Sequence, residues 1–173
     1  WKMGKKISID SATLMNKMLE IIEAQKLFSI SQEKLDIVIH PESLVHAIVE
    51  LKNGLYKFIY HDTSMIIPLA NAIFEDQLNI EDFLKLKSSF KKNNTFKNLN
   101  FLKVNKKIFP VINLKNRINE HNSTPIIINA ANEILVDQYL KKKLHFISIY
   151  KLILSVLNDR NYKKYAIKEP KSI

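Results

Sequence analysis

Four polar side chains of different chemistry gather in one short stretch near the start of the chain. Ser11, Asn16, Lys17 and Glu20 bring a hydroxyl, an amide, an ammonium and a carboxylate into residues 5–23, KKISIDSATLMNKMLEIIE. The first turn of a helix presents backbone N–H groups that lack helical partners, together with the positive end of the helix dipole. These side chains at the start of a helix therefore favour binding of an anion such as phosphate.

The spacing of apolar residues predicts the elements that would position these groups. A short β-type run over residues 6–9 is expected to end at a cap, Asp10 or Ser11, and a helix is expected to follow as far as Phe28. The apolar face of that helix comprises Leu14, Met15, Met18, Leu19 and Ile22. On the opposite face, at positions i, i+4 and i+7, are Asn16, Glu20 and Glu23.

The same residues also have a purely structural interpretation. A Ser or Asp before a helix commonly serves only as its N-cap. A Lys17–Glu20 pair on a solvated helix face stabilises the helix by only about 0.2–0.5 kcal/mol. The residue pattern alone leaves the anion site and the capped surface helix both open.

Longer motifs resemble one enzyme family. Residues 1–20, WKMGKKISIDSATLMNKMLE, resemble the flap and active-site helix of the 1-deoxy-D-xylulose 5-phosphate reductoisomerase family. Residues 39–46 (IHPESLVH), the hairpin that follows them, and residues 128–133 (INAANE) match further motifs of that family in the same order. The resemblance implies an NADPH-dependent oxidoreductase with bound Mg²⁺ or Mn²⁺ that isomerises and reduces a phosphorylated sugar. Its reaction converts 1-deoxy-D-xylulose 5-phosphate to 2-C-methyl-D-erythritol 4-phosphate in non-mevalonate isoprenoid biosynthesis.

The resemblance also implies roles for the polar residues of the helix. Ser11 and Asn16 would hydrogen-bond the substrate phosphate, and Lys17 would bind it by charge. Glu20 would be a metal ligand and would also contact the substrate oxygens. Lys17 and Glu20 are therefore the expected catalytic residues.

Other implied roles lie outside that helix. Trp1 and Met3 would belong to a flap that closes over the substrate, and Gly4 would lie at the NADPH. His46 would support the active site, although a lone histidine in a strand context is more often structural. The family's other metal ligands and its dinucleotide fingerprint precede the position of Trp1, and two glycines cannot supply such a fingerprint. We therefore expect a C-terminal fragment that lacks the NADPH-binding domain and is inactive alone.

The expected fold is α+β. Residues 35–40 read as a strand, and an Asn53-Gly54 turn between Leu44–Leu51 and Leu55–Tyr60 predicts a hairpin. The strands are expected to form a mixed or antiparallel sheet beside the Ser11 helix, and the resemblance implies that this sheet contributes to a homodimer. Helices are predicted at residues 62–74, 113–120, 124–143 and 146–157, with Thr124 as an N-cap and a loose tail after Lys163.

Three segments are expected along the chain. Residues 1–78 would form part of a catalytic and dimerisation domain, residues 79–109 a linker, and residues 110–173 a small helical C-terminal domain. The middle of the chain departs from the family pattern. Ile66 stands where the family has an arginine, the strand before it lacks the usual Gln and Gly, and Glu42 replaces a common Gln.

Composition excludes several classes of protein. The 173 residues have no cysteine, so no disulfide framework is possible, and no apolar run approaches the roughly 20 residues that span a bilayer. A cytoplasmic protein without membrane or nucleic-acid partners is expected, although the net charge is +10. Residues 85–107 carry eight lysines with Phe90, Phe96 and Phe101 between them, which leaves a lysine-rich nucleic-acid-binding module as one alternative. An inactive scaffold that only dimerises is the other.

Overall fold

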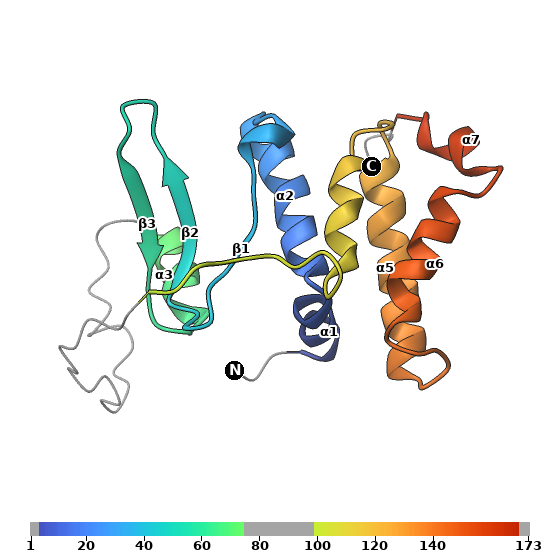
Figure 1. Cartoon of the computed structure of the whole chain (residues 1–173), viewed down its shortest axis with the longest axis horizontal. Helices are drawn as coiled ribbons and strands as arrows, with labels where there is room; N and C mark the ends of the chain where they lie inside the picture. The colour runs from blue at the N-terminus through green and yellow to red at the C-terminus, as the bar shows by residue number, and fades with distance from the viewer. Residues whose placement is uncertain (1–3, 75–98, 170–173) are drawn as a thin grey trace. The chain divides into compact units, whose positions relative to one another are not determined.

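The computed structural model describes residues 4–74 and 99–169, which form two compact units (Figure 1). Among these residues, 38–74 and 99–103 form one unit, here called the hairpin unit. Residues 4–37 and 104–169 form the other, here called the helical unit. The helical unit is thus discontinuous in sequence, because the hairpin unit interrupts it.

The helical unit contains five α-helices and two 3-10 helices among its described residues. In chain order these are α1 (Lys5–Thr13), α2 (Met15–Phe28), η1 (Gln32–Lys34), η3 (Pro110–Asn116), α5 (Thr124–Leu140), α6 (Ser148–Leu157) and α7 (Tyr162–Ala166). Figure 1 shows α5 lying beside α6, and α5 also packs against α1, whereas α2 packs against η3. In the part of the chain that the structure describes, no helix is long and apolar enough to cross a membrane.

One apolar core joins these helices. Met15, Met18 and Ile21 of α2 are buried at i, i+3 and i+6. Ile149, Ile153 and Leu157 are buried at i, i+4 and i+8 of α6, as expected for one face of a helix. The rest of the core is supplied by Val111, Ile112, Leu114, Ile118, Ile128 and Val136.

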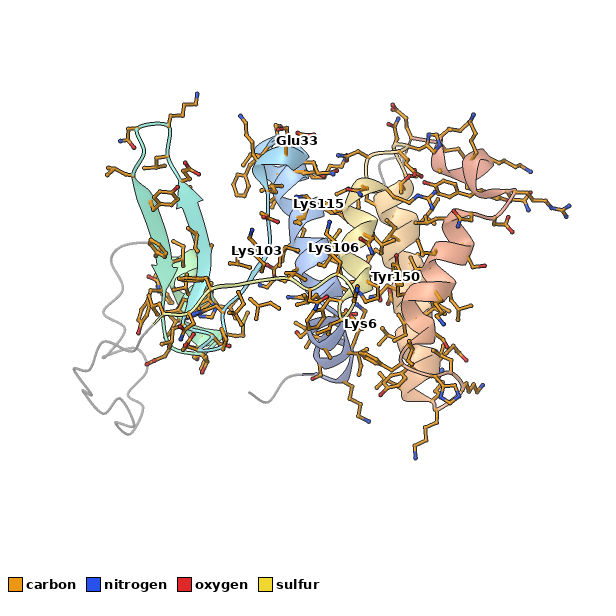
Figure 2. All side chains as sticks on the ribbon, viewed as in Figure 1. Lys6, Glu33, Lys103, Lys106, Lys115 and Tyr150 are labelled. Carbon is orange, nitrogen blue, oxygen red and sulfur yellow. The ribbon has the colours of Figure 1, made fainter. Side chains whose placement is uncertain are left out.

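The first element differs from the sequence prediction. Residues 6–9 are not a strand but the start of α1, whose N-cap is Gly4. Asp10 and Ser11 therefore lie inside a helix and do not cap one. Lys6 Nζ pairs with Asp10 Oδ2 at 2.7 Å, an i, i+4 contact that only a helix makes (Figure 2 labels Lys6). Residues 6–9 alternate between polar and apolar as in a strand, but the Lys6–Asp10 pair favours a helix over these residues.

The predicted single helix over residues 11–28 is in fact interrupted. Leu14 adopts a left-handed conformation, with φ of 63°, and separates α1 from α2. The hydroxyl of Thr13 accepts a hydrogen bond from the backbone N–H of Met15 at 3.3 Å, which satisfies one donor at the break. A non-glycine residue in this conformation requires support from surrounding contacts, and Leu14 packs against the core.

A buried polar contact fixes α1 against α5. The carboxylate of Asp10 is only 3% exposed, and Asn132 is fully buried. Asn132 Nδ2 donates to Asp10 Oδ1 at 2.8 Å, and Lys6 binds the other carboxylate oxygen. Because a buried carboxylate is costly without hydrogen-bond partners, this contact ties the two helices together.

A second polar network closes the end of the helical unit. Arg117 donates to both carboxylate oxygens of Glu120, at 2.5 and 2.9 Å, and to Asn158 Oδ1 at 2.7 Å. The hydroxyl of Tyr162 donates to Glu120 Oε2 at 3.1 Å and lies 2.6 Å from the hydroxyl of Thr124. Thr124 therefore begins α5 with its hydroxyl bound to Tyr162. The sequence predicted Thr124 as the N-cap of α5, but the N-cap is Ser123.

The hairpin unit contains the predicted Asn-Gly hairpin. Strand β2 (Val45–Glu50) pairs antiparallel with β3 (Tyr56–Tyr60), and Gly54 has the positive φ, 83°, that its turn requires. A bulge interrupts the register between Val45 and Ala47. After the hairpin comes α3 (Ile66–Phe74), which starts four residues later than predicted because residues 62–65 form a turn around Ser64.

A second antiparallel pair lies in the same unit. Strand β1 is only Val38–Ile39, shorter than the predicted strand over residues 35–40, and it pairs with β4 (Leu102–Lys103). His40 Nδ1 donates to the backbone oxygen of Asn100 at 2.8 Å, and the side chains of Asn100 and Glu42 bind each other. The hydrogen bond from Asn100 lowers the pKa of the Glu42 carboxyl. The Glu42 carboxylate thus accepts a hydrogen bond from Asn100 beside β1, and its charged form is favoured.

The α+β fold class is confirmed, with smaller sheets than expected. The predicted helix over residues 113–120 is a 3-10 helix at Pro110–Asn116, α5 and α6 are shorter than predicted, and α7 occupies part of the supposedly loose tail. Figure 2 labels Lys115 of η3, whose side chain donates to the backbone oxygen of Leu35, a residue 80 positions earlier in the chain. The domain boundaries stay a prediction, and the compact units group residues 4–37 with the C-terminal helices.

Replacing Asn132 by alanine should destabilise the protein by about 1–3 kcal/mol, because the buried Asp10 carboxylate would lose a hydrogen-bond donor. Urea unfolding of the parent and of Asn132→Ala measures the difference. Asn129→Ala is the matched control, since Asn129 lies on the same helix but is exposed. Equal stability of the two variants would contradict the role given to the Asp10–Asn132 contact.

Glu120 should contribute stability only above the acidic range. The hydrogen bond from Arg117 holds the pKa of the Glu120 carboxyl below its ordinary value. Its contribution is therefore present above the unfolded pKa and is lost as the pH falls through the lower folded pKa. Glu120→Gln should lower the melting temperature at pH 7, and the difference from the parent should shrink as the pH falls below the ordinary pKa of a glutamate. Glu133→Gln, an exposed change on α5, should show no such pH-dependent difference.

Candidate functional site

The candidate site lies where α1 meets α2. Ser11 is on the last turn of α1, whereas Asn16, Lys17 and Glu20 are on the first two turns of α2. Lys17 Nζ donates to both oxygens of Glu20, at 2.9 and 3.0 Å, and Asn16 Nδ2 donates to Glu20 Oε1 at 2.7 Å. An amide and an ammonium thus converge on one carboxylate, as the helical spacing predicts.

These groups are accessible. The side chains of Lys17 and Glu20 are 41% and 46% exposed, so a ligand can reach both. An ion pair this exposed stabilises a protein by at most about 1 kcal/mol. Leu14, the residue before α2, offers no side-chain cap. The start of α2 therefore combines a cation, an amide donor and the positive end of a helix dipole, which suits a phosphate.

Glu20 alone does not make a metal site. Carboxylate oxygen is a suitable ligand for Mg²⁺ or Mn²⁺, but such ions require several ligands. Within residues 4–74 and 99–169, no group of three or more His, Asp or Glu residues could hold a metal ion. The Glu20 carboxylate could therefore supply one ligand to such an ion but does not form a metal site with its described neighbours.

Of the three predicted site residues near the start of the chain, only one can be placed. Gly4 is described, is exposed, and has open space where a Cβ would be. Trp1 and Met3, the predicted flap residues, lie outside the described residues. The same holds for most of the lysine-rich stretch over residues 85–107.

His46 lies in the hairpin unit, at the bulge between Val45 and Ala47. Its ring stacks on that of His61, with ring centroids 3.8 Å apart and planes inclined by 7°. His46 Nε2 donates to the backbone oxygen of His61 at 3.3 Å. No sequence motif pointed to His61. The register of the hairpin could have predicted this neighbour, because the start of β2 lies beside the end of β3 in an antiparallel pair.

His40 lies directly after β1, beside β4. Its Nδ1 lies 3.0 Å from Glu42 Oε2, and its ring stacks on Phe101 at 4.9 Å. The side chain is 5% exposed. These contacts hold β1 and β4 together, and they leave no surface for a ligand on the Nδ1 side.

Most of the chain matches family models, and members of the same family match its full length. A model described as DXP reductoisomerase C-terminal domain matches residues 62–172, and one described as 1-deoxy-D-xylulose 5-phosphate reductoisomerase C-terminal domain matches residues 1–28. The 1-deoxy-D-xylulose 5-phosphate reductoisomerase of Pelagibacter ubique is 42% identical over 174 residues, which cover 100% of this chain and 44% of that protein. That of a Wolbachia species from Drosophila simulans is 42% identical, covering 92% of this chain and 40% of the relative.

Solved structures agree. The reductoisomerase of Zymomonas mobilis in complex with NADPH has a TM-score of 0.75 and 32% identity, and covers 96% of this chain and 42% of that one. A DOX-P reductoisomerase in complex with NADPH, fosmidomycin and magnesium has a TM-score of 0.83 and 32% identity, covering 95% of this chain and 39% of that one. This chain therefore spans about two fifths of the length of these relatives. Sequence and fold together place it in the DXP reductoisomerase family, in the part that carries the family's C-terminal domains.

Proposed function

We propose that the protein containing this chain is an NADPH- and divalent-metal-dependent 1-deoxy-D-xylulose 5-phosphate reductoisomerase. The observation that carries the proposal is the convergence of Asn16 and Lys17 on Glu20 at the start of α2. Family membership and the relatives solved with NADPH, fosmidomycin and magnesium support it. The substrate would be a phosphorylated sugar, and the product 2-C-methyl-D-erythritol 4-phosphate.

Phosphate binding is the part of the reaction that this chain's residues explain best. Lys17 would supply charge, and Ser11 and Asn16 would supply hydrogen bonds from either side of the break at Leu14. Without ligand, Lys17 and Asn16 bind Glu20, so a phosphate would exchange one set of acceptor oxygens for another with little rearrangement. The positive end of α2 adds to the attraction.

Glu20 would link the phosphate subsite to the reacting carbons. Because Glu20 lies within 3.0 Å of Lys17 Nζ, a substrate held by its phosphate places its oxygens near this carboxylate. A bound Mg²⁺ or Mn²⁺ acts as a Lewis acid that polarises a carbonyl. Glu20 would be one of its ligands, and the remaining ligands would come from outside the described residues.

The remaining roles follow the same proposal. Gly4 would lie near the NADPH, Trp1 and Met3 would cover the substrate, and His46 would support the substrate site. We also propose a homodimer in the cytoplasm. Large apolar side chains exposed on the hairpin unit, among them Leu55 at 62% and Leu69 at 56%, support an interface there. The chain alone, with one candidate metal ligand, is expected not to turn over.

Lys17→Ala and Glu20→Gln should each lower kcat/KM at least about 100-fold, because each removes a charge aimed at the substrate or its metal. The assay follows NADPH oxidation by the intact gene product with 1-deoxy-D-xylulose 5-phosphate and Mn²⁺. Lys26→Ala and Glu23→Gln are matched controls on the exposed surface of the same helix. A well-folded parent without turnover would contradict the proposed function.

Loss of activity in Lys17→Ala should not come from unfolding. Because the Lys17–Glu20 pair is about half exposed, Lys17→Ala should change the free energy of unfolding by no more than about 1 kcal/mol. Urea unfolding of the parent and the variant measures this change. A larger loss would support the alternative interpretation, in which these residues only stabilise the helix.

A further inference from the structure

We infer that His61 is a positioning residue that holds the imidazole of His46, a role that rests on the proposed function, in which His46 supports the substrate site. No motif of the sequence analysis includes His61. The two residues are 15 apart in sequence and meet because the hairpin brings the start of β2 beside the end of β3.

The bulge in β2 sets the direction of His46. Val45 pairs with Tyr60 and Ala47 with Ile59, so His46 is the extra residue of the bulge in β2. A bulge re-aims the side chain of the extra residue and is common beside active sites. The direction of the His46 side chain therefore depends on the residues that contact its ring.

His61 supplies that contact twice. Its ring lies almost parallel to that of His46, with centroids 3.8 Å apart, which is shorter than the 4.5–7 Å typical of aromatic pairs. Its backbone oxygen accepts a hydrogen bond from His46 Nε2. A carbonyl can only accept, so this bond places a proton on Nε2. His61 thus constrains the orientation of the His46 ring and holds a proton on its Nε2.

His61 is itself held on both sides. Its backbone N–H donates to the backbone oxygen of Leu44 at 3.0 Å, and Leu44 is buried. Its ring Nδ1 donates to the backbone oxygen of Asp62 at 2.7 Å. Because the backbone and ring of His61 both have fixed partners, it can act as a rigid support for its neighbour.

The test separates the ring of His61 from its backbone. In the intact protein, His61→Ala should lower kcat/KM about tenfold or more through misplacement of His46. His61→Phe keeps a flat ring for stacking and should recover most of that loss. In a His46→Ala background, His61→Ala should have almost no further effect, because its action passes through His46. Tyr60→Ala, which removes a ring from the preceding residue, is the matched control.

Two readouts distinguish failure of this role from failure of the proposed function. If the parent is active and His61→Ala matches it, or is equally harmful with and without His46, the positioning role is wrong and the proposed function stands. If the folded parent has no reductoisomerase activity, the proposed function is wrong, and the ring-proton NMR signals of His46 decide the positioning role. A shift of those signals in His61→Ala, partly reversed in His61→Phe, supports it, and unchanged signals overturn it.

Discussion

The hydrogen bond between Asp10 and Asn132 is the constraint on which the helical unit depends. A buried carboxylate is tolerated only where donors surround it, so α1 packs on α5 in the position where Asn132 reaches Asp10, while Lys6 of α1 itself binds the other carboxylate oxygen. That position fixes Ser11, the next residue, and through Leu14 it fixes the start of α2. The polar groups of the candidate site thus take their places from a contact with a helix much later in the chain.

Charged residues serve two separate purposes in this protein. Arg117, one of only two arginines, uses its planar fork to bind Glu120, Asn158 and a backbone carbonyl, which is a structural role that lysine could not fill. Lys17 and Glu20 instead meet in solvent, where their pairing adds little stability and can be exchanged for a ligand. The buried or forked pairs maintain the fold, and the exposed pair is available for chemistry.

Local signals in the sequence predicted a large part of this structure. The Asn53-Gly54 turn located the hairpin, helical spacing located α5 and α6, and the i, i+4 spacing of Asn16 and Glu20 brought those groups together. Tertiary contacts account for most of what was missed. The alternation at residues 6–9 is typical of a strand, but the partners of Asp10 select a helix, and no local signal marks the break at Leu14. The contact between His61 and His46 could be predicted only from the exact register of the hairpin, including its bulge.

The discontinuous helical unit has a consequence for synthesis on the ribosome. Asp10 and Asn132 are separated by 122 residues, so α1 and α2 leave the ribosome well before the helix that completes their packing. Until then the apolar side chains of Met15 and Met18 lack their core partners from α5 and α6. The hairpin, in contrast, can close as soon as its own residues emerge, because all its pairings are local. Chain elongation therefore leaves α2 as a transient target for chaperones, and premature termination before α5 would leave it permanently exposed.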